Sequence, residues 1–140
     1  MNINANQQIL MISAEAEDCE QIREVAARAG VGSVYCRKID EARSILAKGD
    51  ACAVFCQDQL PDGDFRAVIA KADAVPVIVL SRFAEWDYYL AALRDGAFDY
   101  IACPPNANET ERILRSAISK SRELLLGAKA EAESAMAAAS

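Results

Sequence analysis

The chain has 140 residues, a formal net charge of -6, 53% hydrophobic residues and 26% charged residues. This length is typical of one globular domain, and the composition excludes disordered and membrane-spanning classes. The negative charge argues against direct binding to nucleic acid phosphates, which needs clustered Lys and Arg. Residues 1–8 are polar and show no signal-peptide pattern, so we expect a cytoplasmic protein without membrane contact.

Five cysteines are scattered along the sequence without any CxxC pair. There is no histidine that would complete a zinc site with them. We therefore expect most of them to be small buried apolar residues in a reducing compartment, and we expect no metal and no cofactor. The five are Cys19, Cys36, Cys52, Cys56 and Cys103.

Short apolar runs predict five buried strands, at residues 9–12, 31–36, 51–56, 75–80 and 98–102. Helical spacing predicts helices between them, at residues 16–29, 39–47, 65–70 and 85–94, and a last helix from about Glu109 onward. Gly49 and Gly96 close two of these helices. Asn108 and Glu111 resemble a capping box at the last one.

The strict alternation of strands and helices predicts an α/β domain with a parallel sheet. The apolar runs do not alternate with polar residues, which is typical of strands that helices cover on both faces. With right-handed crossovers, this pattern favours a flavodoxin-like (βα)5 doubly wound sheet with strand order 2-1-3-4-5. We expect any site at the carboxyl ends of the first and third strands.

The chain divides into three predicted segments, namely a disordered N-terminus at 1–7, a domain at 8–126 and an alanine-rich tail at 127–140. The last helix is expected to run through Leu126 and then meet Gly127. Alanine favours helix, but the tail has few large apolar groups to bury. The favoured interpretation is a frayed tail, and the alternative is a helix that pairs with a partner.

Three stretches resemble the receiver domain of response regulators, the CheY-like superfamily, over roughly residues 8–121. They are QLPDGDF at 59–65, PVIVLS at 76–81 and LRDGAFDYIACPP at 93–105. The resemblance implies a domain that accepts a phosphoryl group from a partner histidine kinase. It also implies where the residues for that reaction would lie.

The phosphoacceptor Asp of the family lies four residues before the Pro of the LP pair, and Gln57 stands at that position here. A neutral carboxamide is a poor nucleophile and forms no equivalent acyl phosphate. The two acids that help hold magnesium in the family correspond to Ser13 and Ala14, with Glu15 one place beyond. Magnesium prefers hard oxygen ligands, so Glu15 alone would hold it weakly.

The conserved Lys of the family corresponds to Cys103, which precedes Pro104, a position where the family often has a cis peptide bond. Ser81 matches the hydroxyl residue after the fourth strand, and Tyr100 matches the aromatic residue whose rotation reports activation. The resemblance therefore implies a degenerate, neutral pocket of a pseudo-receiver. Its members are Ser13, Ala14, Glu15, Gln57, Ser81 and Cys103.

Two sharper hypotheses concern single residues near this pocket. Asp58 is a substitute phosphoacceptor only if its side chain enters the pocket. Successive strand side chains point to opposite faces, so we expect a solvated loop carboxylate directed away from Gln57. Cys56 and Cys103 suggest a redox switch, but only Arg82 is placed to lower a thiol pKa, so buried thiols are favoured.

The predicted fourth helix carries three aromatic residues within four positions, Trp86, Tyr88 and Tyr89. Residues this close spread around a helix, so at least one is expected on the surface. In receiver domains the surface of the fourth helix, fifth strand and fifth helix commonly serves dimers or partner docking. Aromatic residues are favoured anchors in such interfaces.

The sequence predicts a signalling domain of the two-component phosphorelay type that is not an enzyme, is not phosphorylated and acts through protein–protein interaction. Its partner is a signalling protein or a second copy in a homodimer. One alternative is a receiver still phosphorylated at an atypical site such as Asp58. Another is small-molecule or redox sensing in the neutral pocket near Gln57, Ser81 and Cys103.

Overall fold

The computed structural model describes residues 8–139, and the predicted disordered segment 1–7 lies outside that range. In chain order, the elements are β1 (Gln8–Ile12), α1 (Ala16–Arg28), β2 (Gly32–Cys36), α2 (Ile39–Lys48), β3 (Ala51–Gln57), β4 (Gln59–Leu60), β5 (Gly63–Asp64), α3 (Phe65–Ala72), β6 (Val77–Ser81), α4 (Trp86–Arg94), β7 (Asp99–Ala102) and α5 (Ala107–Ala139). All five predicted strands and all five predicted helices are present, with shifts of a few residues at their ends except at the end of α5, which runs well beyond Leu126.

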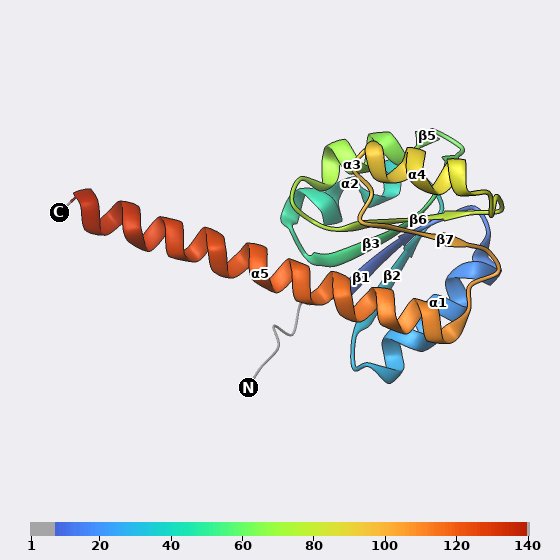
Figure 1. The fold of residues 1–140 in the computed structure, drawn as a ribbon, viewed down its shortest axis with the longest axis horizontal. Helices are drawn as coiled ribbons and strands as arrows, with labels where there is room; N and C mark the ends of the chain where they lie inside the picture. The colour runs from blue at the N-terminus through green and yellow to red at the C-terminus, as the bar shows by residue number, and fades with distance from the viewer. Residues whose placement is uncertain (1–7, 140) are drawn as a thin grey trace.

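The main sheet has five parallel strands in the order β2-β1-β3-β6-β7 (Figure 1). Since β6 and β7 are the fourth and fifth predicted strands, the order 2-1-3-4-5 and the flavodoxin-like class are confirmed. A short antiparallel hairpin, in which β4 pairs with β5, was not predicted. Two-residue strands carry too little periodicity to be recognised in a sequence.

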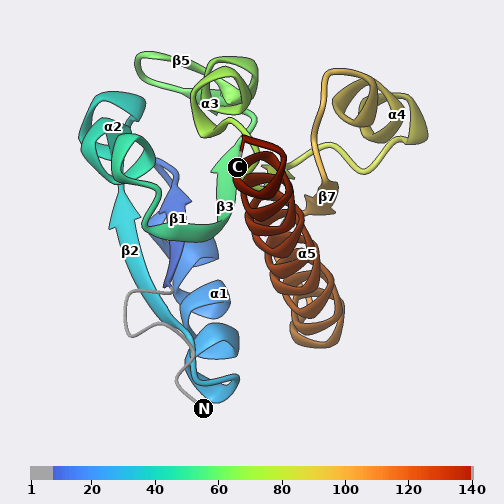
Figure 2. The ribbon, with the colours of Figure 1, turned by 90° about the vertical axis from the view of Figure 1, so that its left-hand side faces the viewer.

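Helices cover both faces of the sheet, with α1 and α5 on one face and α2, α3 and α4 on the other (Figures 1 and 2). Side chains of β1 alternate between these layers. Ile9 and Met11 belong to the core beneath α1 and α5, whereas Leu10 and Ile12 belong to the core beneath the other three helices. This alternation determines the layer that each residue at a strand end faces.

Two predictions about α5 were wrong. Its first turn is capped by Asn106, whose Oδ1 accepts a hydrogen bond from the Glu109 N–H at 3.0 Å, so Asn108 is not the cap. The expected fraying does not occur within the described residues, because α5 continues through Gly127 to Ala139 and projects beyond the sheet (Figure 1). A helix already nucleated by packing propagates through alanine, and one Gly costs only about 1 kcal/mol.

Within residues 8–139, no helix is both long and apolar enough to cross a bilayer.

Candidate functional site

The carboxyl ends of β1 and β3 meet in a closed hydrogen-bond network around Gln57. The Ser13 hydroxyl donates to Gln57 Oε1 at 2.9 Å, and the Ala14 N–H donates to the same oxygen at 3.0 Å. Ser13 is only 1% exposed. The half-buried Gln57 carboxamide therefore satisfies two donors, one of them the buried Ser13 hydroxyl, which is a structural role.

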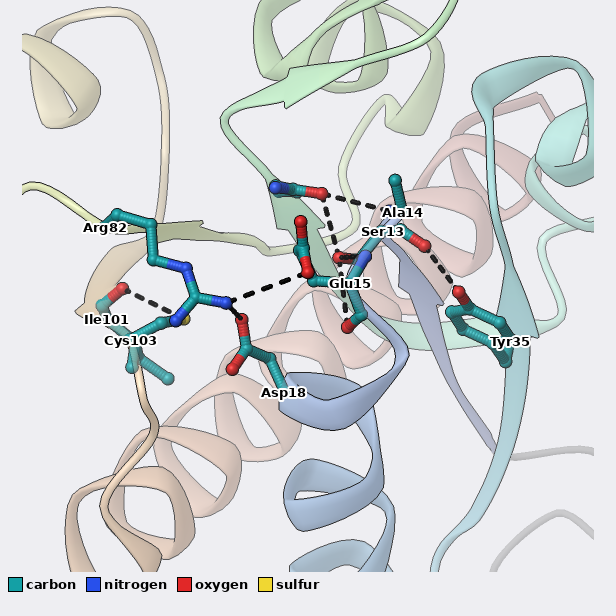
Figure 3. A network of polar contacts seen from close by, with 9 residues as sticks. Ser13, Ala14, Glu15, Asp18, Tyr35, Arg82, Ile101 and Cys103 are labelled. Atoms are coloured by element: carbon teal, nitrogen blue, oxygen red, sulfur yellow. Dashed lines mark hydrogen bonds and ion pairs between the residues drawn. The ribbon is translucent and has the colours of Figure 1, made fainter.

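The loop after β1 is tied down by further contacts of Ser13 (Figure 3). The Glu15 N–H donates to Ser13 Oγ at 2.9 Å, and the Tyr35 hydroxyl donates to the Ser13 carbonyl oxygen at 2.7 Å. Tyr35 was not predicted as a site residue, because only the parallel pairing of β2 with β1 brings it beside Ser13. Gln57, the residue at the end of β3, is a carboxamide and forms no acyl phosphate.

An ion cluster borders this network, so the prediction of a neutral pocket was wrong. The Arg82 guanidinium lies 3.0 Å from a carboxylate oxygen of Asp18 and 3.9 Å from one of Glu15 (Figure 3). Asp18 is buried at 7% exposure, near the N-terminus of α1, where the helix dipole favours a negative charge. Asp18 was not predicted as a site residue, since no local sequence pattern connects it to Arg82.

Cys103 lies near Asp18 and Arg82 (Figure 3). Burial and, to a lesser degree, the nearby Asp18 raise the pKa of the Cys103 thiol to about 12. Burial also raises the pKa of Cys19 to about 11 and that of Cys56 further still. Such thiols are protonated near neutral pH and react slowly, which weighs against the redox switch. The Cys103-Pro104 peptide bond is cis.

Gln57 and Ser81 do not share a pocket, contrary to the sequence prediction. Gln57 pairs in register with Leu80, so Ser81 stands one position further along its strand. A one-residue step reverses the face, which places Ser81 on the side of the neighbouring Asp58, under α2, α3 and α4. The predicted pocket is therefore divided between the two layers.

Asp58 is not the solvated loop carboxylate that the sequence suggested, although it does face away from Gln57. Its Oδ2 accepts a hydrogen bond from the Ser81 hydroxyl at 3.0 Å, and its Oδ1 accepts one from the Gln59 N–H at 3.0 Å. Ser81 in turn accepts the Phe83 N–H at 3.1 Å. These bonds hold the Asp58 side chain in one orientation.

Tyr100 belongs to the same layer as Asp58. Its hydroxyl donates to the Phe83 carbonyl oxygen at 2.5 Å, so the ring points toward the loop between β6 and α4. Burial raises the pKa of the Tyr100 hydroxyl, and Asp58 and Glu85 raise it further. By the resemblance, Tyr100 stands at the position whose rotation reports activation. Its ring is anchored to the loop between β6 and α4.

Aromatic side chains gather on the surface at the start of α4, as the sequence analysis expected. Trp86 is 67% exposed and Tyr88 is 48% exposed, while Tyr89 packs against the core and meets Tyr100 edge-on at 6.1 Å. Phe83 was not anticipated, because it precedes the helix. It is 47% exposed and stacks on Tyr88 with ring centroids 4.6 Å apart.

No group of three or more Cys, Asp or Glu side chains is arranged to hold a metal ion within the described part of the chain.

Comparison by sequence alone finds little, since no protein-family model matches the chain and no curated protein matches it significantly. Comparison of structures finds many receiver domains. A putative response regulator from Chloroflexus aurantiacus has a TM-score of 0.73 at 19% identity, over 80% of this chain and 97% of that one.

Two further solved structures agree with the first. The signal receiver domain of an HD domain-containing protein from Pseudomonas fluorescens has a TM-score of 0.75 at 16% identity, over 88% of this chain and 94% of that one. The beryllofluoride-activated NtrC4 receiver domain dimer has a TM-score of 0.73 at 16% identity, over 83% of this chain and 98% of that one. The chain therefore has the fold of response regulator receiver domains.

Proposed function

We propose that this protein is a degenerate receiver of the two-component type that transmits signals by binding a protein, without being phosphorylated at the site its fold provides. The observation that carries the proposal is the engagement of Gln57. Its carboxamide oxygen accepts hydrogen bonds from Ser13 and Ala14, at the strand end where the resemblance requires an ionised acceptor. A carboxamide held in this way supports the fold and offers no nucleophile.

The positive charges available near Gln57 also support this proposed function. The resemblance calls for a Lys at the position of Cys103, and a protonated thiol cannot neutralise phosphoryl oxygens. Arg82 is the nearby cation, and it is already paired with Asp18 and Glu15. A phosphoryl group at this edge would therefore lack the charge stabilisation on which its transfer depends.

Phosphorylation at Asp58 is the less favoured alternative. Asp58 faces the opposite layer from Ser13 and Ala14, and its oxygens accept hydrogen bonds from Ser81 and Gln59. Magnesium usually needs one or two carboxylates together with phosphate oxygens and water. No cluster of three such ligands surrounds Asp58 in the described residues.

The surface that would bind a partner is the aromatic patch formed by Phe83, Trp86 and Tyr88. Large aromatic side chains lose little conformational entropy on binding and often dominate the energy of an interface. Both a signalling protein and a second copy of this chain are candidate partners. A receiver dimer is known among the structural neighbours, in NtrC4.

The test is incubation with acetyl phosphate and magnesium, followed by intact mass measurement of the wild type, Gln57→Asp and Asp58→Asn. We expect no added phosphate on the wild type, because Gln57 cannot form an acyl phosphate. A receiver domain that autophosphorylates, treated in parallel, confirms that the donor is active. Labelling of the wild type that disappears in Asp58→Asn would contradict the proposal and restore phosphorylation at an atypical site.

A further inference from the structure

A pocket of about 190 Å³ opens beside Asp58, between β6, β7, α3 and α4. It is smaller than the roughly 300–1,000 Å³ usual for small-molecule sites. A cavity of about 150 Å³ already holds a benzene molecule. The space therefore suits one side chain better than a cofactor. The lining residues that matter here are Asp58, Phe65, Arg66, Phe83, Tyr88 and Tyr100.

Asp58 carries a negative charge with no cationic partner. Its two hydrogen bonds come from a neutral hydroxyl and a backbone N–H, and it forms no ion pair with a Lys or Arg whose side chain the structure describes. A carboxylate has about four acceptor positions, so further donors can be accommodated. A half-buried carboxylate of this kind gains most from a cation that enters beside it.

Arg66 lines the same pocket but does not neutralise Asp58. Its guanidinium lies 2.7 Å from an oxygen of Asp95 and 3.1 Å from one of Asp64, so its charge is already balanced. It also lies over the ring of Phe65, 4.6 Å from the centroid. Guanidinium groups stack well on aromatic faces. The wall of the pocket thus already shows the kind of contact that a second guanidinium would make.

We infer that this pocket receives an arginine side chain of the partner protein, whose guanidinium pairs with Asp58 while its stem lies against Phe83 and Tyr88. The inference rests on the proposed function, because it names the chemistry of the partner. Arginine is favoured over lysine since its planar group both stacks on rings and donates two parallel hydrogen bonds to a carboxylate. The exposed Trp86 at the start of the same helix extends the contact.

The experiment is a titration of ¹⁵N-labelled full-length protein, followed by ¹H–¹⁵N correlation spectra. The probe is the blocked tripeptide Gly-Arg-Gly, and its control is Gly-citrulline-Gly, which has the same shape but no charge. We expect the arginine probe to shift the amide signals of Asp58, Phe83 and Tyr88, with a millimolar Kd. The citrulline probe should bind about tenfold more weakly, because it lacks the charge.

Three variants locate the contact. Asp58→Asn should raise the Kd of the arginine probe about tenfold, to that of the citrulline probe. Asp87→Asn removes the same charge from an exposed position on α4 and should leave binding unchanged. Tyr88→Leu should weaken the binding of both probes, because it removes an aromatic ring that lines the pocket. The dispersion of each spectrum shows whether the variant is folded.

Equal binding of the two probes, or equal binding by wild type and Asp58→Asn, would overturn the inference, as would the absence of any shift. None of these results bears on whether Gln57 is phosphorylated, so they leave the interaction proposal standing. Tighter binding of free methylguanidine than of the blocked arginine peptide would also contradict it, since the occupant would then be a small molecule and not a side chain of a protein.

Discussion

Gln57 and Asp58 are neighbours in the chain, yet they lie in two regions that differ in almost every respect. Around Gln57, the polar groups of Ser13 and Ala14 are satisfied within the protein, and Arg82 is paired with Asp18. Around Asp58, the carboxylate has no counter-ion and exposed aromatic rings border a pocket. One step along the chain separates a closed region from an open one.

The proposed function would explain this difference, as a receiver fold that is kept without the phosphorylation chemistry. On the Gln57 side, hydrogen bonds and an ion pair stand where the resemblance implies a metal and a phosphoryl group, so no buried charge is left without a partner. On the Asp58 side, charge and apolar surface remain available. We therefore expect perturbations of the first region to change stability and perturbations of the second to change binding.

The largest expected effect comes from alkaline pH, through thiols on both sides of the sheet. Burial raises the pKa of Cys19 to about 11, and it raises that of Cys56 as well. Folded and unfolded chains both keep these thiols protonated below pH 8. Between about pH 9 and 10.5 the unfolded chain ionises more than the folded chain, so the free energy of unfolding falls, by about 2 kcal/mol for Cys19 near pH 10.5 and further through Cys56.

Urea unfolding at pH 8 and at pH 10.5 measures this fall. The control is the double variant Cys19→Ala and Cys56→Ala, in which the difference between the two pH values should shrink. If the variant loses as much stability as the wild type over this interval, the thiols are not the cause, and the raised pKa values are wrong. A thiolate already present at pH 8 would also return the redox switch to consideration.

The second prediction contrasts the neighbouring residues directly. Gln57→Ala should lower the free energy of unfolding by about 2 kcal/mol, because it leaves the Ser13 hydroxyl and the Ala14 N–H without their acceptor. Asp58→Asn keeps an acceptor oxygen and should change it by no more than about 0.5 kcal/mol. Urea denaturation at pH 7.5 compares them. Equal losses from the two variants would remove the distinction between a closed and an open region.

The smallest expected effect tests the ion cluster. Arg82→Ala leaves the buried Asp18 without its cation, but the Arg82 side chain is 51% exposed, so we expect a loss of only about 1 kcal/mol. Salt should reduce the difference between the variant and the wild type. Thermal unfolding in 50 mM and 500 mM salt measures both effects, because the Debye length falls about threefold between these two concentrations.

Arg28→Ala is the matched control for that measurement. Arg28 and Glu24 form a surface pair at 4.0 Å, with both side chains more than half exposed. Exposed pairs of this kind contribute little to stability. A loss in Arg28→Ala as large as that in Arg82→Ala would mean that the cluster around Asp18 has no special role in holding the loop between β6 and α4.

The sequence by itself determined the order of elements and the class of sheet. Apolar runs of four to six residues, separated by helical stretches, are local patterns that survive in the folded state. The sequence also places Gln57 at the end of the third predicted strand. It follows from the residue type alone that this carboxamide does not attack phosphorus. The exposure of aromatic residues on α4 followed from helical periodicity alone.

Only the tertiary structure decided which residues share a region. The pairing of Gln57 with Leu80 sets the register of β3 against β6, and a shift of one residue would move Ser81 to the other layer. Likewise, Arg82 reaches Asp18 only because β6 and α1 meet at one edge of the sheet. Register and the packing of distant elements depend on the whole fold, so no local pattern encodes the division between the closed region and the pocket beside Asp58.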